Sequence, residues 1–174
     1  MSLREISFFG VIDKVQIAVD RLKAYEPKEG YFLAFSGGKD SVTVKALCDL
    51  SGVKYDAHYS VTSVDPPELV EFIKREHPDV SRDIPHDKDG APVTMWNLIP
   101  KKLMPPTRLV RYCCKALKES AGDGRITLTG VRWAESTNRK KNQGIATIYK
   151  TASSAEREEL LAAGFLQTDR GGWC

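Results

Sequence analysis

In the first third of the chain, apolar residues first recur at helical spacing, then form one continuous run, and then recur at helical spacing again. A helix is predicted over residues 10–25, where apolar and aromatic residues recur at helical spacing among charged ones, at Val11, Val15, Ala18, Leu22 and Tyr25. The uninterrupted apolar run 31–35 predicts a strand that is buried on both faces. Residues 40–51 return to a helical pattern, and Gly52 suits the left-handed cap that ends many helices.

The rest of the chain continues this alternation. Residues 54–61 predict a second strand, and residues 66–77 predict a helix with a proline suited to its first turn. The proline-rich stretch 83–107 predicts an irregular excursion with one short helix around Trp96. Further along, the pattern predicts a helix, a strand and a serine-capped helix, over residues 108–120, 125–131 and 153–165. Alternating strands and helices indicate a three-layer α/β fold, in which a parallel sheet has helices on both faces.

Length and composition indicate a single domain of a cytoplasmic protein. A chain of 174 residues is long enough to bury one sizeable core, so we expect residues 1–174 to form one α/β domain. No apolar run approaches the roughly 20 residues that cross a membrane, so we expect no membrane partner. The N-terminal residues lack the apolar region of a signal peptide, and four cysteines without a C-x-x-C pair fit a reducing compartment.

Positive charge is concentrated in one part of the sequence. The net charge of the chain is only +3, but residues 101–150 hold twelve lysines and arginines against three acids. The remaining residues are therefore acidic on balance. Such a local excess predicts an anionic partner, either a nucleotide or a nucleic acid, and a solvated basic surface is the simpler alternative.

The segment S-G-G-K-D-S at residues 36–41 joins the predicted strand 31–35 to the helix that follows. It is neither a Walker A loop nor a G-x-G-x-x-G dinucleotide fingerprint. Gly37 and Gly38 permit positive φ and a close backbone approach, and amides at a helix N-terminus favour an anion. The segment adds two hydroxyl donors and a cation, at Ser36, Ser41 and Lys39. These features together predict a phosphate-binding loop.

Asp40 is the unexpected member of this loop, because a carboxylate repels a phosphate unless a metal ion stands between them. A Mg²⁺ ion held by Asp40 would resolve that conflict. The alternative without a ligand is a tight strand-to-helix turn in which Asp40 is the N-cap of the helix. We favour the phosphate loop, because capping alone does not require two glycines, a lysine and two serines together.

The SGGKDS segment resembles the pyrophosphate loop of the adenine nucleotide alpha-hydrolase superfamily, the N-type ATP pyrophosphatases. The resemblance implies a Rossmann-like α/β fold and cleavage of ATP between its α- and β-phosphates, with release of pyrophosphate. It also implies catalytic roles for Lys39 and Asp40, with Mg²⁺ on Asp40. All six loop residues are implied to bind the phosphates: Ser36, Gly37, Gly38, Lys39, Asp40 and Ser41.

Three later segments resemble the phosphoadenylyl-sulfate reductase family within that superfamily. Thr62, Ser63 and Asp65 lie where the second predicted strand ends, at the edge of a parallel sheet where ligands bind. The resemblance implies contacts to ribose or adenine at Thr62, Ser63 and Val64, and a polar loop that caps the next helix is the alternative. The segment RLVRYCCKALKE arrays cations along one face of a helix, at Arg108, Arg111, Lys115 and Lys118. The segment TGVRWAESTNR matches the family's anion site. It implies a nucleotide contact at Gly130, a catalytic role for Arg132, and an anion pocket of Arg108, Arg111, Arg132, Glu135, Ser136 and Arg139.

The adjacent cysteines Cys113 and Cys114 also have a counterpart in that family. In its iron–sulfur branch, two such cysteines ligate a [4Fe–4S] cluster together with a downstream C-x-x-C pair. That second pair is missing here, and Cys48 and Cys174 are distant in the sequence. We therefore expect no intact cluster, and we interpret Cys113 and Cys114 as buried thiols. Relatives continue past residue 174, so we expect a shortened or truncated member.

The sequence thus predicts an ATP-binding enzyme that resembles the phosphoadenylyl-sulfate reductase family and acts in sulfur metabolism or sulfur transfer. Its expected partners are an adenine nucleotide, Mg²⁺ and an unidentified acceptor that contains sulfur, and a homodimer is compatible with this reading. Two alternatives stay open. Sulfur transfer onto tRNA or DNA would explain the basic stretch, and a degenerate module would bind a nucleotide without catalysis.

Overall fold

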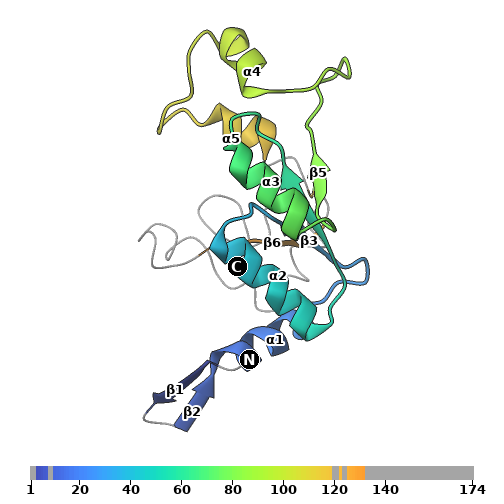
Figure 1. The fold of residues 1–174 in the computed structure, drawn as a ribbon, viewed down its shortest axis with the longest axis vertical. Helices are drawn as coiled ribbons and strands as arrows, with labels where there is room; N and C mark the ends of the chain where they lie inside the picture. The colour runs from blue at the N-terminus through green and yellow to red at the C-terminus, as the bar shows by residue number, and fades with distance from the viewer. Residues whose placement is uncertain (1–2, 8–9, 119–121, 123–124, 132–174) are drawn as a thin grey trace, which may run out of the picture. The chain divides into compact units, whose positions relative to one another are not determined.

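The computed structural model describes residues 3–7, 10–118, 122 and 125–131. All of these except Val131 belong to one compact unit, Met1–Gly130 (Figure 1). The helix predicted over residues 153–165 lies outside the described residues, and the single domain predicted over residues 1–174 stays a prediction. No helix in the described part of the chain is long and apolar enough to cross a membrane.

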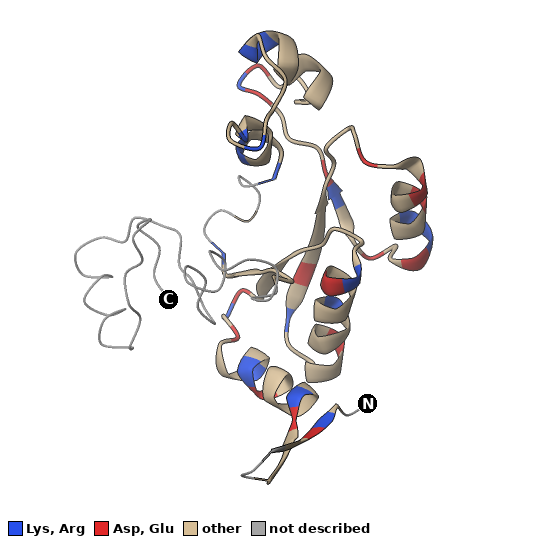
Figure 2. Cartoon of the chain, turned by 90° about the vertical axis from the view of Figure 1, so that its left-hand side faces the viewer, with Lys and Arg blue, Asp and Glu red and all other residues tan. Residues whose placement is uncertain are grey.

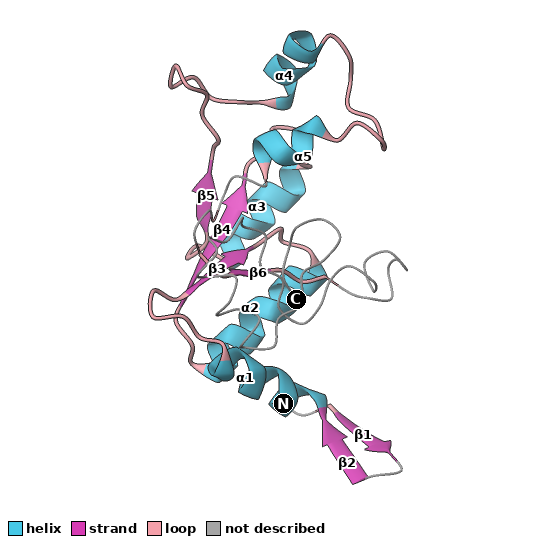
Figure 3. Ribbon diagram, turned by 180° about the vertical axis from the view of Figure 1, so that it is seen from behind, coloured by secondary structure: helices cyan, strands magenta, loops and turns pink. Residues whose placement is uncertain are grey.

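Four parallel strands form the central sheet of this unit. They are β3 (Tyr31–Ala34), β4 (Tyr55–Ser60), β5 (Ser81–Asp83) and β6 (Thr127–Leu128). Their order is β5-β4-β3-β6, and every pairing is parallel (Figure 3). The chain therefore passes from β3 to β4 to β5 in one direction, and it returns to the other side of β3 with β6.

Two helices, α2 (Lys39–Ser51) and α3 (Pro67–Glu76), cover one face of this sheet. Alternate residues of the first strand run point to this face and are buried in its two hydrophobic clusters, at Tyr31, Leu33 and Phe35. Ile73 of α3 belongs to the first cluster and Cys48 of α2 to the second. Phe32, which points to the opposite face, is buried too, so the prediction of a strand buried on both faces is confirmed.

The opposite face of the sheet carries aromatic and polar side chains. Phe32 stacks on His58 of β4 with ring centroids 4.3 Å apart, and His58 Nδ1 lies 2.7 Å from Asp83 Oδ2. Arg125 forms an ion pair of 2.7 Å with Asp56, which also points to this face. The predicted parallel sheet flanked by helices is confirmed, whereas the three-layer arrangement with helices on both faces stays a prediction.

Local sequence signals explain the helix ends that were predicted correctly. Gly52 ends α2 in the left-handed region, with φ 71°, where a glycine is not strained. Pro67 begins α3 at a position where a missing N–H is no loss. The short helix expected around Trp96 is confirmed as α4 (Met95–Lys102), which Thr94 opens with a capping box.

The helix predicted over residues 10–25 is only partly right. It begins at Lys14, as α1 (Lys14–Ala24), because the Asp13 side chain caps its first turn by accepting hydrogen bonds from two backbone amides. The residues before α1 form an antiparallel hairpin of β1 (Arg4–Ser7) and β2 (Gly10–Asp13). Apolar residues in this short stretch fit either period, so the pattern could not distinguish the two structures.

The helix predicted over residues 108–120 is reduced to α5 (Tyr112–Leu117) in the described residues. The residues before α5 form a turn, in which Thr107 N donates to Val110 O at 3.1 Å and Val110 N donates to Thr107 Oγ1 at 3.0 Å. Arg108 therefore lies in a turn, and Arg111 is only the N-cap of α5. The prediction that these arginines share one helical face with the later lysines is wrong.

Candidate functional site

Loop 36–41 lies where the order of strands in the sheet reverses. It follows the carboxyl end of β3, and β3 has β4 on one side and β6 on the other. The connection that leaves β3 leads to β4, whereas the chain reaches β6 only after β5. In open parallel sheets, ligands bind at the carboxyl ends of the strands, in the crevice at such a switch point. The loop and the residues that follow β6 are therefore the first candidates for a shared site.

Gly130, which follows β6, is packed against the start of α2. A Cβ atom added to Gly130 would lie 2.9 Å from Asp40 C and 3.0 Å from Asp40 O, closer than a methyl group can approach a backbone. The residues after β6 thus meet loop 36–41 backbone to backbone, which only glycine allows. The structure brings together two segments that are far apart in the sequence and that were both predicted to bind a nucleotide.

Glycine conformation and one buried hydroxyl hold the loop in shape. Gly37 has φ 71°, and a Cβ atom there would lie 2.7 Å from Leu69 Cδ1 of α3. Ser41 Oγ accepts hydrogen bonds from Ser36 N and Ser36 Oγ, both at 3.2 Å, and it donates to Gly38 O at 2.9 Å. Ser41 is only 4% exposed. Its hydroxyl therefore stabilises the loop from inside, although the sequence suggested that it donates to a phosphate.

The N-terminus of α2 is open to an anion. Gly38 is the N-cap, and as a glycine it has no side chain to accept a hydrogen bond from the amides of the first turn. Asp40 lies within the first turn, so the alternative in which Asp40 caps the helix is wrong. Lys39 is exposed at the same end, and its side chain has no partner among the described residues. The helix dipole, the backbone amides and an ammonium group thus all favour negative charge here.

The residues after β4 are engaged within the protein. Thr62 is buried, and both its amide and its hydroxyl donate to Asp65 Oδ2. Ser63 has φ 66°, and its Oγ accepts a hydrogen bond of 3.0 Å from Met95 N at the start of α4. Val64 is half exposed. Of the three residues expected near ribose or adenine, the two hydroxyls are therefore used to position neighbouring segments, and only Val64 presents its side chain to solvent.

Asp65 organises this end of β4, the edge of the sheet where the sequence placed it together with Thr62 and Ser63. Its Oδ2 accepts hydrogen bonds from Tyr59 Oη at 2.7 Å and from Thr62. Burial alone would raise the pKa of this carboxyl, but the hydrogen bonds and the charge of Lys118 outweigh burial and hold the pKa below its usual range.

The segment expected to supply an anion pocket is only partly described. Arg108 and Arg111 are exposed, and Arg111 Nη2 lies 3.3 Å from Cys114 Sγ. Cys113 and Cys114 are free thiols on α5 that are half buried rather than fully buried. The expected absence of an intact cluster stays a prediction. The remaining anion-pocket residues lie outside the described residues: Arg132, Glu135, Ser136 and Arg139.

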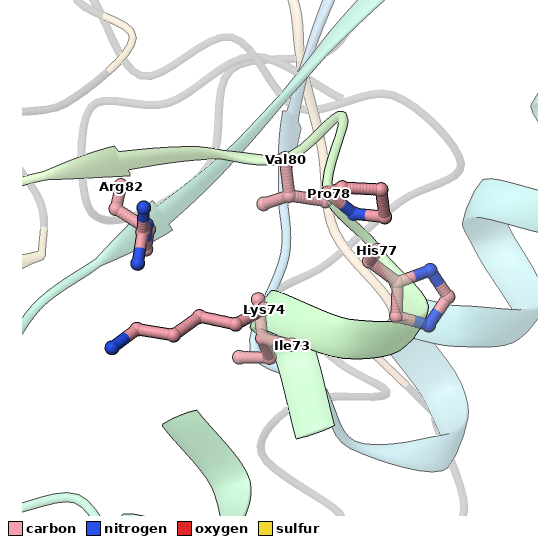
Figure 4. A pocket seen from close by; sticks show the side chains of 6 residues that line it. All are labelled: Ile73, Lys74, His77, Pro78, Val80 and Arg82. Carbon is pink, nitrogen blue, oxygen red and sulfur yellow. The ribbon is translucent and has the colours of Figure 1, made fainter. Parts of the chain in front are cut away.

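A hollow of about 320 Å³ lies on another part of the sheet (Figure 4). It is lined by residues from the end of α3 to the middle of β5: Ile73, Lys74, His77, Pro78, Val80 and Arg82. These residues lie toward the amino end of β5, whereas loop 36–41 lies at the carboxyl end of β3. No residue predicted to bind a ligand lines this hollow, so the switch point of the sheet is the better candidate on chemical grounds.

Within the described residues, no three histidines, cysteines, aspartates or glutamates are grouped closely enough to hold a metal ion. No family model, curated protein or solved structure matches the chain. What the candidate site can bind is therefore inferred from its own geometry and from the chemistry of its residues.

Replacing Gly130 with alanine should destabilise the protein, because the new methyl group would be forced against the backbone of Asp40. Overpacking of this kind costs about 1–3 kcal/mol, which urea unfolding can measure. Gly38→Ala is the matched control, because a Cβ atom at Gly38 would meet only Ser36 Oγ, at an ordinary 3.5 Å. Equal unfolding free energies for Gly130→Ala and the wild type would contradict the close approach of these segments.

Asp65→Asn should lower the unfolding free energy at neutral pH by about 1–3 kcal/mol, because Tyr59 and Thr62 would lose a charged acceptor. The pKa of Asp65 is lower in the folded chain than in the unfolded chain. Its contribution is therefore complete above the unfolded pKa of about 3.9, and it is lost as the pH falls through the folded pKa. Unfolding measured from neutral to acid pH should show the two proteins converging, whereas a constant difference would contradict a charged role. Asp20→Asn on the exposed surface of α1 is the control.

Proposed function

We propose that the chain binds ATP, or a related adenine nucleotide, in the crevice between loop 36–41 and the residues that follow β6. The observation that carries this proposal is the coincidence of an open, glycine-rich helix N-terminus with the switch point of a parallel sheet. The packing of Gly130 on Asp40 supports it, because a shared site requires both segments to be close. The phosphates would lie on the loop amides and on Lys39.

The reaction that fits this arrangement is displacement at the α-phosphorus, as the resemblance of the loop implies. An acceptor atom would donate an electron pair to the α-phosphorus, and the bond from that phosphorus to the bridging oxygen would break. Pyrophosphate would leave with the electron pair of the broken bond, and the acceptor's pair would form the new bond to the α-phosphorus. The loop amides and the Lys39 ammonium would stabilise the negative charge that develops on the leaving oxygens, because they are positioned before the reaction begins.

Asp40 is suited to hold a Mg²⁺ ion that arrives with the nucleotide. Such ions are bound by one or two carboxylates together with phosphate oxygens and water, so one acidic residue in the first turn of α2 is sufficient. Asp40 is half buried in the first turn of α2, beside Gly130. When bound, the metal would neutralise charge on the phosphates.

The acceptor would be held by residues beyond Gly130. An arginine presents a planar fork of donors that binds oxyanions in a bidentate manner. An acceptor that contains sulfur, such as a sulfur oxyanion, is the chemical class that the resemblance implies, with Arg132 in the catalytic role and Arg139 as a second cation.

Lys39→Ala should weaken ATP binding by roughly 10- to 150-fold, because a charge-assisted contact to phosphate contributes about 1.5–3 kcal/mol. Titration calorimetry measures the change. Lys54→Ala is the matched control, because Lys54 is an exposed lysine just before the amino end of β4, away from the crevice. Unchanged affinity for ATP in Lys39→Ala would overturn the proposed site.

Asp40→Asn should keep ATP binding in the absence of metal and lose the dependence of ATP affinity on Mg²⁺.

Transfer onto a nucleic acid is the second candidate, and the charge distribution favours it. Residues 90–118 contain six lysines and arginines and no acidic residue. Figure 2 shows this basic stretch on α4, α5 and the segment between them. Trp96 of α4 is 69% exposed while its Nε1 donates to Ser63 O, so its ring is held facing solvent. Cations combined with an exposed aromatic ring are typical of surfaces that bind single strands.

The salt dependence of tRNA binding distinguishes this candidate from a small acceptor. If a nucleic acid binds, Lys102→Ala should weaken binding modestly and reduce the slope of log affinity against log salt by about one. If the acceptor is small, Lys102→Ala should leave ATP cleavage unchanged and tRNA should not be retained. A module that only binds nucleotide would show ATP affinity but release no pyrophosphate with any acceptor offered.

A further inference from the structure

The hairpin of β1 and β2 leaves an apolar face uncovered. In the described part of the chain, these strands pair with each other, in a sheet separate from the four-stranded one (Figure 3). A two-stranded ribbon is at best marginally stable alone in water. Ile6 is 91% exposed and Val11 is 65% exposed. A cover over this face would remove that apolar surface from water and stabilise the hairpin.

The register of the hairpin shows which residues share the uncovered face. Directly opposite residues in an antiparallel pair point to the same side, and so do alternate residues along a strand. The register therefore places two cross-strand pairs on one face, Arg4 with Asp13 and Ile6 with Val11. Glu5 points to the other face, where it forms an ion pair with Lys14.

The two pairs on the uncovered face each consist of residues that attract one another. Arg4 and Asp13 are a cation and an anion, and Ile6 and Val11 are both apolar and branched. A two-fold axis parallel to the strands would lay β1 of one copy over β2 of a second copy at the same level. Arg4 of each copy would then face Asp13 of the other, and Ile6 would face Val11. A face that is complementary to itself is what a closed two-fold interface requires. We propose that a second copy of this chain covers the face.

The charged groups of this face are available for such contacts. Arg4 has no ion-pair partner among the described residues. Asp13 uses Oδ1 for both of its capping hydrogen bonds, at 3.0 Å and 3.3 Å, which leaves Oδ2 for an arginine. Stable complexes bury about 1,200–2,000 Å² in total, and two short hairpins bury less than that. The dimer is therefore weak and concentration-dependent, and it does not depend on nucleotide binding.

Sedimentation velocity of the full chain, from micromolar to millimolar concentration, tests this proposal. Arg4→Glu and Asp13→Lys each place like charges across the interface, so each should raise the concentration for half association by at least about tenfold. Glu5→Gln, on the opposite face of the same strand, should change nothing. Ile6→Lys is a second disruption that leaves the cap of α1 intact, and it should also favour the monomer.

An equal mixture of Arg4→Glu and Asp13→Lys should recover the association that each variant has lost. In the mixed dimer the two substituted positions face each other, and the native Arg4 faces the native Asp13. Circular dichroism should show that both variants keep the wild-type fold. A wild-type chain that stays monomeric at millimolar concentration, single variants that associate like the wild type, or folded variants that do not recover on mixing would each overturn the proposal.

Discussion

The contact of Gly130 with the backbone of Asp40 is the constraint on which the candidate site depends. β6 pairs with β3 through two residues only, with Leu128 beside Leu33. The chain after this short strand must then pass the first turn of α2, where the distance leaves no space for a Cβ atom. Any other residue at this position would push the two segments apart, and the arrangement of the candidate site would change.

The polar groups of loop 36–41 have two different roles. The Ser41 hydroxyl is buried and bonded to the loop itself, so it stabilises the conformation in which the α2 N-terminus stays open. Lys39 points outward and remains available for a ligand. A helix N-terminus contributes about 0.3–1 kcal/mol toward a surface anion, whereas a charge-assisted hydrogen bond contributes about 1.5–3 kcal/mol. Lys39 therefore supplies more of the attraction, and the helix end mainly determines where the anion is placed.

Sequence periodicity predicted the elements that carry the site but not the contacts that assemble it. The run 31–35, the helix that ends at Gly52 and the helix that starts at Pro67 have strong local signals, because burial on both faces and cap residues act over a few positions. The pairing of β6 with β3 brings together residues that are far apart in the sequence, so no local pattern predicts it. The approach of Gly130 to Asp40 follows from that pairing, so the sequence suggested both residues but could not show that they meet.

The short elements were predicted least well, because the sequence patterns for helix, strand and turn are all weak over a few residues. Val11 fitted a helical period, but it lies in β2, and α1 begins only after Asp13, which caps the helix. The hydroxyl of Thr107 closes a turn that stops the next helix from starting early. Asp65 gained its role from the burial of Tyr59 and Thr62, which depends on the packing of the whole sheet.

The location of the nucleotide is the central claim, and hydrogen exchange of the backbone amides measured with and without ATP and Mg²⁺ tests it most directly. A nucleotide in the crevice should slow exchange at residues 36–41 and at residues 128–130, because both segments border the same site. Exchange at residues 73–82, which line the separate hollow, should not change. Protection confined to residues 73–82, or protection of the loop without any effect after β6, would contradict the account.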